Sequence, residues 1–311
     1  MECSCGVGPT YGIEWSYDSS LGPSKWPRIF AKCKGSRQSP VAISTSMVHM
    51  NRTLGRIYLR GFSKIQQYTV ENVGATVVVT ATPGQLIPRV ENPSTGEVYI
   101  FDSLHFHWTS EHVVNGVRFA MEAHFVLYNG KYKDINSARE HDDGLEVVAA
   151  LFQVRALPNP KLRRLLSGIS RVLDPHQKTT IAMALDDLLP VYISTYFRYP
   201  GSLTTPLCDE VVTWTLLYPP SSVGAKQAVV ITVTLRDRNW PTTYKTRTIC
   251  HGRLANLASS MKDTPVARTQ WHPGSACTNR YEIPRWLPLV GRKLRKFLIG
   301  VLSSLRSAPG T

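Results

Sequence analysis

Ser103-Leu104-His105-Phe106-His107-Trp108 is the stretch from which the fold of this chain can be worked out. Its two histidines stand at positions i and i+2 of an apolar, aromatic run, so in an extended strand they point to the same face. A second such run, 119–126, carries His124. Between the runs lies Val114-Asn115-Gly116, and an Asn-Gly pair is typical of the turn between antiparallel strands. The pattern predicts paired strands over 98–108 and 117–128.

His105, His107 and His124 have the residue type and the spacing of metal ligands. Three neutral imidazoles that leave a fourth position open describe a catalytic zinc site, not a closed structural one. Glu122 has the same strand parity as His124, so its carboxylate can accept the free N–H of a ligating ring. A lone His-x-His in a strand is more often a surface or packed pair. The two runs by themselves leave that alternative open.

Other short motifs accompany these runs in a fixed order. They are Trp15-Ser-Tyr17, Gly22-Pro-Ser-Lys-Trp26, Gly35-Ser-Arg-Gln38-Ser39-Pro40-Val41, Ser110-Glu111-His112, Gly144-Leu145, Tyr199-Pro200-Gly201-Ser202-Leu203-Thr204-Thr205-Pro206 and Val212-Thr213-Trp214. Together with Leu-His-Phe-His-Trp and Glu122-Ala-His124-Phe-Val, the ordered set closely resembles the α-class carbonic anhydrases. The resemblance runs from about residue 10 to about residue 250.

The resemblance implies a mainly β (α+β) fold. Its centre is a single large, twisted, mostly antiparallel sheet of about ten strands with short peripheral helices. We expect a leader over 1–9, a carbonic-anhydrase-like catalytic domain over 10–250 and a basic extension over 251–311. The residue pattern itself predicts a strand pair around Gly74, a buried central strand over 144–154, strands over 211–218 and 228–235, and a helix over 160–173.

The resemblance also implies the chemistry of the site. His105, His107 and His124 would bind Zn2+, and a zinc-bound hydroxide would hydrate CO2 reversibly to bicarbonate and a proton. Zinc lowers the pKa of its bound water towards about 7, a value established for carbonic anhydrase itself. Thr204 and Glu111 would be the catalytic pair. The hydroxyl of Thr204 would orient the hydroxide and donate to Glu111, because an ionised carboxylate can only accept.

Further residues follow from the same resemblance. Those expected to surround and position the zinc ligands without binding the metal are Glu122, Ser103, Asn239 and Tyr199. Those expected to line the substrate pocket are Val126, Val147, Leu203, Thr205, Val212 and Trp214. Carbon dioxide is apolar and needs a dry wall beside the metal. Without the resemblance, the apolar members of this set would be ordinary core residues.

Two positions depart from the pattern of the family. Ala75 follows Gly74 where many fast members carry a proton-shuttling histidine, so the shuttle histidine is absent at this position. Ser103 stands where a glutamine usually holds the first zinc histidine, and loss of such a supporting bond costs about 10–100-fold in metal affinity or activity. We expect an active lyase whose turnover is limited by proton transfer.

Six cysteines are too few for a disulfide scaffold in a chain of 311 residues. Cys33 and Cys208 resemble the pair that secreted and membrane-bound members of the family bridge. Disulfides persist in oxidising compartments, which favours a secreted or membrane-associated protein. The N-terminus shows no signal peptide pattern, so a cytoplasmic location stays open. The other cysteines, which can pair or stay free, are Cys3, Cys5, Cys250 and Cys277.

The chain is strongly basic, with 36 Lys and Arg against 22 Asp and Glu, a formal net charge of +14. Such a charge favours anionic partners. Residues 286–305 form a basic amphipathic pattern that predicts a helix, and such a helix can lie on an anionic membrane or polyanion. Docking of this helix on the protein's own core or on a partner stays open. No nucleic-acid-binding module is recognisable, so no specific nucleic-acid partner is expected.

The sequence therefore leaves two functions open. The first is a zinc lyase that hydrates CO2. The second is a non-catalytic, carbonic-anhydrase-like protein that binds an anionic polymer or surface through its basic face. Relatives that have become binding proteins typically lack a zinc histidine, whereas His105, His107 and His124 are all present here. This favours the enzyme.

Overall fold

The structure, a computed structural model of the whole chain, describes residues 15–17, 20–234 and 256–258. Its strands, in chain order, are β1 (Ala42–Ile43), β2 (His49–Met50), β3 (Tyr58–Arg60), β4 (Gln66–Asn72), β5 (Val77–Ala81), β6 (Arg89–Asn92), β7 (Glu97–His107), β8 (Val113–Val114), β9 (Val117–Arg118), β10 (Met121–Asn129), β11 (Leu145–Arg155), β12 (Lys178–Met183), β13 (Tyr196–Gly201), β14 (Val212–Gly224) and β15 (Asn256–Ala258). The helices are all short. They are α1 (Trp26–Ile29), η1 (Ala31–Lys34), η2 (Arg52–Leu54), α2 (Ile135–Ala138), η3 (Pro160–Leu162), α3 (Arg163–Ile169), η4 (Leu185–Leu188) and α4 (Ala225–Thr234), where η marks a 3-10 helix.

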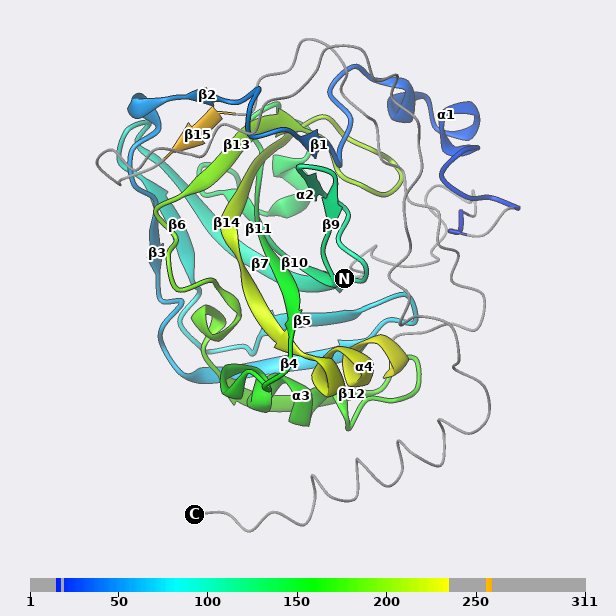
Figure 1. Cartoon of the computed structure of the whole chain (residues 1–311). Coiled ribbons are helices and arrows are strands. Elements are labelled where there is room, and N and C mark those ends of the chain that lie inside the picture. The colour runs from blue at the N-terminus through cyan, green and yellow to red at the C-terminus, as the bar shows by residue number, and fades with distance from the viewer. Residues whose placement is uncertain (1–14, 18–19, 235–255, 259–311) are drawn as a thin grey trace. The chain divides into compact units, whose positions relative to one another are not determined.

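A 12-stranded sheet dominates this part of the chain (Figure 1). Ten of its strands follow the order β12-β4-β5-β7-β10-β11-β14-β13-β15-β2, and β3 and β6 pair beside β7. Most neighbours are antiparallel, but β11 and β14 run parallel, and so do β15 and β2. The expected mainly β fold with a large, mostly antiparallel sheet and short peripheral helices is confirmed.

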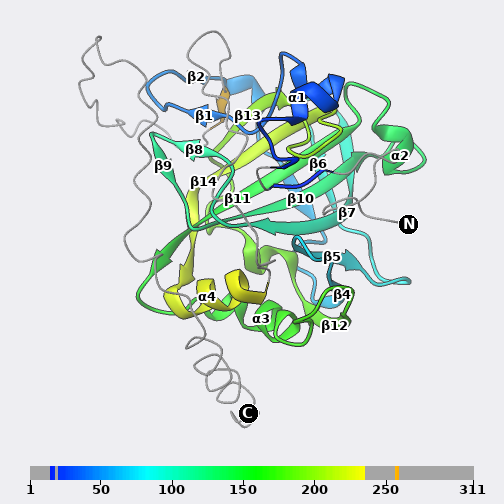
Figure 2. The same ribbon diagram turned by 90° about the vertical axis from the view of Figure 1, so that its right-hand side faces the viewer.

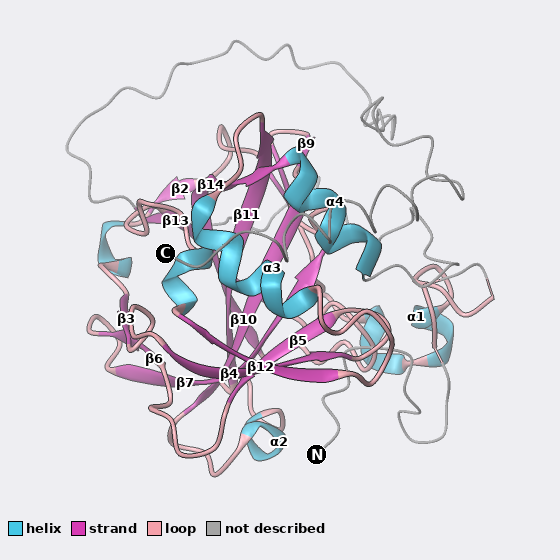
Figure 3. Ribbon diagram, turned by 90° about the horizontal axis from the view of Figure 1, so that it is seen from below, coloured by secondary structure: helices cyan, strands magenta, loops and turns pink. Residues whose placement is uncertain are grey.

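The two faces of the sheet carry separate hydrophobic clusters. Leu104 and Phe106 of β7 belong to the larger cluster, which also contains Leu165 and Ile169 of α3. Figures 2 and 3 show α3 and α4 lying together on this side of the molecule. Because side chains alternate along a strand, His105 and His107 point to the opposite face. That face carries the second cluster, which includes Trp214.

Several local predictions are confirmed. β4 and β5 pair antiparallel around Gly74, whose φ is +88°. β11 is buried over its first eight residues and lies between β10 and β14. The helix predicted over 160–173 is present as η3 followed by α3. These segments combine a clear hydrophobic period with turn residues at their ends, and local pattern is sufficient for such elements.

The Asn115-Gly116 turn forms, with φ values of 50° and 77°, but it does not join the two histidine-bearing strands directly. It closes the small hairpin β8–β9, which pairs with β1 in a separate three-stranded sheet. The run predicted as one strand over 117–128 is consequently divided into β9 and β10. β7 and β10 are paired nevertheless, and the small hairpin lies in the connection between them.

The strand predicted over 228–235 is wrong, because residues 225–234 form helix α4. The run is rich in β-branched residues, but the preference of such residues for strands is small and depends on context. β14 continues beside β11 as far as Gly224. Beyond it, Ala228, Val230 and Ile231 become buried as α4 packs near α3. Burial of one helical face outweighs the local preference.

The sheet continues past residue 250, where the resemblance was expected to end, because β15 pairs with β13 and β2. The predicted leader, Asn239, the helix near 286–305 and four cysteines lie outside the described residues. Within residues 15–17, 20–234 and 256–258, no helix is long and apolar enough to cross a membrane.

Candidate metal centre

The three histidines converge across the β7–β10 pair. His124 lies opposite His105, and Glu122 lies opposite His107. The ring centroids of the histidines are 4.5–5.2 Å apart. One ring nitrogen from each lies within 4.8 Å of the other two. The pairing register therefore brings together the ligand set that the sequence predicts.

Burial keeps these rings neutral. Removal from water and, to a smaller extent, the proximity of His124 together lower the pKa of His105 to about 3. Burial likewise lowers the pKa of His107 well below its ordinary value and lowers that of His124. A histidine binds a metal through a neutral ring nitrogen, so all three are competent ligands at neutral pH. Moreover, Nε2 of His107 is buried and has no hydrogen-bond partner in the described part of the chain, as fits an atom that coordinates a metal.

Glu122 holds two histidines from behind. Its Oε1 lies 2.7 Å from Nε2 of His124 and 2.6 Å from Nδ1 of His112, and its Oε2 accepts the backbone N–H of His112 at 2.9 Å. Burial would raise the pKa of Glu122, but His112 and His124 lower it well below its usual range. An ionised Glu122 accepts from Nε2 of His124, which leaves Nδ1 of that ring for a metal. Glu122 therefore contacts His124 as its strand parity predicts, and its support of a metal ligand stays a prediction.

His112 is a member of this network that the sequence did not assign to the site. Its Nε2 lies 2.6 Å from the hydroxyl of Tyr199, which lies 3.1 Å from Oγ of Ser39. Ser39 in turn accepts the backbone N–H of Ser202 at 3.0 Å. The chain of contacts links the histidine strands to the segment that carries Thr204. In the sequence, only the position of His112 beside Glu111 could have indicated that His112 belongs to the site.

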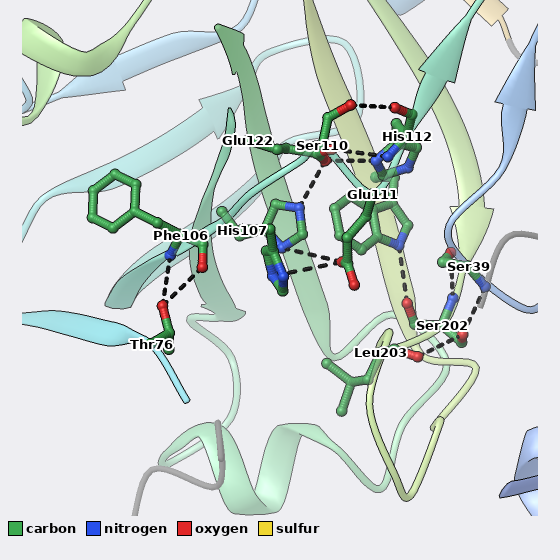
Figure 4. Close-up of polar contacts among 12 residues, drawn as sticks. Ser39, Thr76, Phe106, His107, Ser110, Glu111, His112, Glu122, Ser202 and Leu203 are labelled. Carbon is green, nitrogen blue, oxygen red and sulfur yellow. Dashed lines mark hydrogen bonds and ion pairs between the residues drawn. The ribbon is translucent and has the colours of Figure 1, made fainter. Parts of the chain in front are cut away.

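Glu111 and Thr204 both lie at the site. Figure 4 shows the carboxylate of Glu111 directed at the histidines; its Oε2 is 3.5 Å from Nε2 of His107 and 4.0 Å from Nδ1 of His124. Glu111 is 3% exposed, and Thr204, 7% exposed, lines the same cavity as the histidines. The hydrogen bond from Thr204 to Glu111 stays a prediction.

A cavity opens in front of the histidines. The predicted pocket residues that line it are Val126, Val147, Leu203, Thr205 and Trp214, and Ser103 and Ala75 line it as well. Val212 is not part of the lining; it is 2% exposed and packs in the second hydrophobic cluster. Asp102, Ile135 and Arg139 line the cavity without having been predicted. Asp102 lies at a register irregularity of the β7–β10 pair, and periodicity does not indicate which face such a residue reaches.

The predicted disulfide between Cys33 and Cys208 is present, with an S–S distance of 2.03 Å. Around it pack Trp15, Trp26 and Phe30. The amide of Gln38 donates to the carbonyl of Cys208 at 3.2 Å. The bridge therefore fastens the segment after Thr204 to the N-terminal part of the domain.

Comparison with known proteins agrees with this geometry. The model of the eukaryotic-type carbonic anhydrase family matches residues 21–249. Carbonic anhydrase 6 of Mus musculus is 33% identical over 239 residues, which are 73% of this chain and 74% of the relative. Carbonic anhydrase 4 of Oryctolagus cuniculus is 36% identical over 219 residues, covering 68% and 69% of the two chains. Carbonic anhydrase 12 of Homo sapiens is 29% identical over 238 residues, covering 73% and 66%. The chain belongs to the α-class, eukaryotic-type carbonic anhydrase family.

Proposed function

We propose that this chain is an active carbonic anhydrase, a zinc lyase that interconverts CO2 and bicarbonate. The observation that carries the proposal is the set of three buried, neutral histidines at a cavity with an apolar wall. Members of the family hydrate CO2 in general. The proposal adds that this member has kept the activity.

The polar residues of the site have separate roles in holding the metal and orienting the attacking oxygen. Zinc held by His105, His107 and His124 supplies, when bound, a Lewis acid that makes water a nucleophile at neutral pH. The ionised Glu122 fixes the ring of His124, so that Nδ1 of that ring faces the metal. Glu111, which only accepts, turns the hydrogen of the Thr204 hydroxyl towards itself and leaves the lone pairs of that hydroxyl to orient the attacking oxygen.

The apolar wall holds the substrate. Val126, Val147, Leu203 and Trp214 line the cavity beside the histidines. An apolar wall binds CO2 without competing hydrogen bonds, whereas charged bicarbonate is better solvated in water and leaves. The backbone N–H of Thr204 and the hydroxyl of Thr205 supply the polar contacts for the bicarbonate oxygens.

Proton release is the slow step in this proposal. Ala75 lines the cavity at the position where many fast members of the family carry a shuttle histidine, and its methyl group carries no proton. Imidazole from the buffer can enter the cavity and take over this role. Turnover therefore rises with imidazole concentration, while the hydration step itself is unchanged.

The first test measures CO2 hydration by the zinc-loaded full chain, with and without imidazole. His107→Ala removes a ligand and should lower activity by more than about 100-fold, beyond the effect of losing a supporting residue. His49→Ala changes an exposed histidine of β2 and serves as the matched control. Zinc-containing wild-type protein with no activity above His107→Ala would contradict the proposal and support the non-catalytic binding protein instead.

We also propose that the protein works in an oxidising compartment, secreted or at a membrane. The Cys33–Cys208 disulfide supports this, because cytosolic proteins keep their thiols reduced. Alkylation of the native protein before and after reduction, followed by mass spectrometry, measures the state of both cysteines. Quantitative alkylation of both before reduction would contradict the proposed location.

A further inference from the structure

The surface around α3 has an unusual concentration of positive charge. From Arg155 to Leu173 the chain contains five basic residues and no acidic one. The basic residues, all exposed, are Arg155, Lys161, Arg163, Arg164 and Arg171. Within residues 15–17, 20–234 and 256–258, none of them forms an ion pair with a carboxylate, whereas Arg60 and Arg89 elsewhere share Glu91. Asp186 of η4 interacts electrostatically with its neighbour Asp187 and with Lys161.

Helix α4 adds a further cation to the same surface. The backbone N–H of Asn159 donates to Oε1 of Gln227 at 2.7 Å, and Nε2 of Gln227 donates to the carbonyl of Asn159 at 2.8 Å. A third bond joins Nδ2 of Asn159 to the carbonyl of Ser222 at 2.9 Å. These contacts fasten the loop before η3 to the first turn of α4, so exposed Lys226 lies beside it. Figure 3 shows α3 and α4 on this common face.

An apolar side chain lies among these cations. Leu157, between Arg155 and Lys161 in the chain, is 79% exposed and is one of the most exposed large hydrophobic residues of the described chain. Val154 and Leu173, at the two ends of the stretch, are 36% and 46% exposed. A soluble polyanion would contact the cations and gain nothing from these apolar groups. A lipid surface uses both, because phosphate groups attract the cations while apolar side chains enter the boundary of the acyl chains.

The orientation of this surface is compatible with an open active site. The buried side of α3 packs on the cluster that contains Leu104 and Phe106, on the face of β7 opposite to His105 and His107. A flat partner that contacts the exposed side of α3 therefore approaches from the side of the sheet away from the histidines. The cavity remains accessible to CO2 and bicarbonate.

We propose that this α3 surface, formed by Arg155, Leu157, Lys161, Arg163, Arg164, Arg171 and Lys226, binds anionic phospholipid membranes. The cations contact the lipid phosphates, and Leu157 inserts at the level of the headgroups. The proposal is independent of the proposed CO2 hydration. It is also separate from the predicted contact through residues 286–306.

The test is co-sedimentation of the full chain with vesicles of phosphatidylcholine alone or mixed with phosphatidylserine. We expect binding to the mixed vesicles only. Arg163→Glu with Arg164→Glu should weaken it by at least about tenfold, since each basic residue near an anionic surface contributes appreciably. Arg28→Glu with Lys34→Glu, an equal charge change at exposed positions of α1 and η1, should leave it within about twofold. Both pairs of substitutions are also compared in a chain that carries Arg292→Glu, Arg295→Glu and Lys296→Glu. This second comparison separates vesicle binding by the α3 surface from any binding by the C-terminal segment.

Leu157→Ser distinguishes a membrane from a soluble polyanion. Vesicle binding should fall several-fold in this variant, while retention on heparin stays unchanged; Val191→Ser, at another exposed position, is the control. Wild-type binding in Arg163→Glu with Arg164→Glu would overturn the proposal. So would an unchanged affinity of Leu157→Ser for vesicles, because the charge would then be the only determinant. Unfolding temperatures confirm that each variant is folded.

Discussion

The two faces of strand β7 are both buried, but one carries apolar side chains and the other carries histidines. Leu104 and Phe106 are 0% and 1% exposed in the apolar cluster under α3, while His105 and His107 are 9% and 6% exposed on the other face. On the first face burial contributes stability through the hydrophobic effect. On the second face burial keeps imidazoles neutral and so available as ligands. One strand with a period of two residues thus separates the apolar core from the histidine cluster.

The largest expected effect on stability comes from the apolar face of the sheet, to which Phe125 of the neighbouring strand β10 also belongs. Phe125 is completely buried, and its ring centroid lies 5.7 Å from that of Phe62. Phe125→Ala should lower the free energy of unfolding by about 3–5 kcal/mol, because it leaves a cavity in the core. Urea unfolding of the folded variant measures this. A loss below about 1 kcal/mol would mean that the cluster repacks and that this face is less rigid than its burial indicates.

On the opposite face, Glu122→Gln should weaken zinc binding by about 10–100-fold. The amide cannot accept from His112 and His124 as the carboxylate does, so the ring of His124 is no longer fixed. Competition with a zinc chelator measures the affinity. Glu140→Gln, an exposed acid outside this network, is the control. Equal affinities of the two variants would show that Glu122 does not position the ligands.

The polar face should also make stability dependent on pH. Between the ordinary histidine pKa of 6.5 and about 3, an unfolded chain binds a proton at His105 that the folded protein does not. The free energy of unfolding of the metal-free protein should therefore fall as pH decreases through this range, by at most about 1.4 kcal/mol per pH unit for this group. His107 and His124 act in the same direction. His105→Asn should reduce the slope; an unchanged slope would assign the dependence to other groups.

The smallest expected effect lies at the turn between β8 and β9, outside both faces. Gly116 has a φ of +77°, a conformation that residues with a Cβ rarely adopt. No atom lies within 4 Å of an added Cβ, so Gly116→Ala tests backbone strain alone. It should cost about 1 kcal/mol of stability. Stability equal to wild type would show that the turn relaxes without affecting the sheet.

The sequence could predict those parts of the site that depend on alternation along one strand. The faces of β7 and β10, and with them the positions of His105, His107, His124 and Glu122, follow from a period of two residues. It could not predict that Asp102 reaches the cavity, because Asp102 lies at a break in the β7–β10 register. Nor could it show that Val212 lies outside the cavity lining, because that depends on the packing of Val212 in the second hydrophobic cluster.

The sequence by itself therefore determined which three histidines lie on one face, the Asn-Gly turn, the buried central strand and the family. Each of these rests on a short, ordered group of residues whose spacing has a direct physical meaning. Only the tertiary structure decided that residues 225–234 form a helix and that His112 connects Glu122 to Tyr199. Both depend on neighbours distant in sequence: α3 buries one side of α4, and Tyr199 comes from β13. Contacts of that kind leave no periodic trace in the segment itself, so local reasoning cannot detect them.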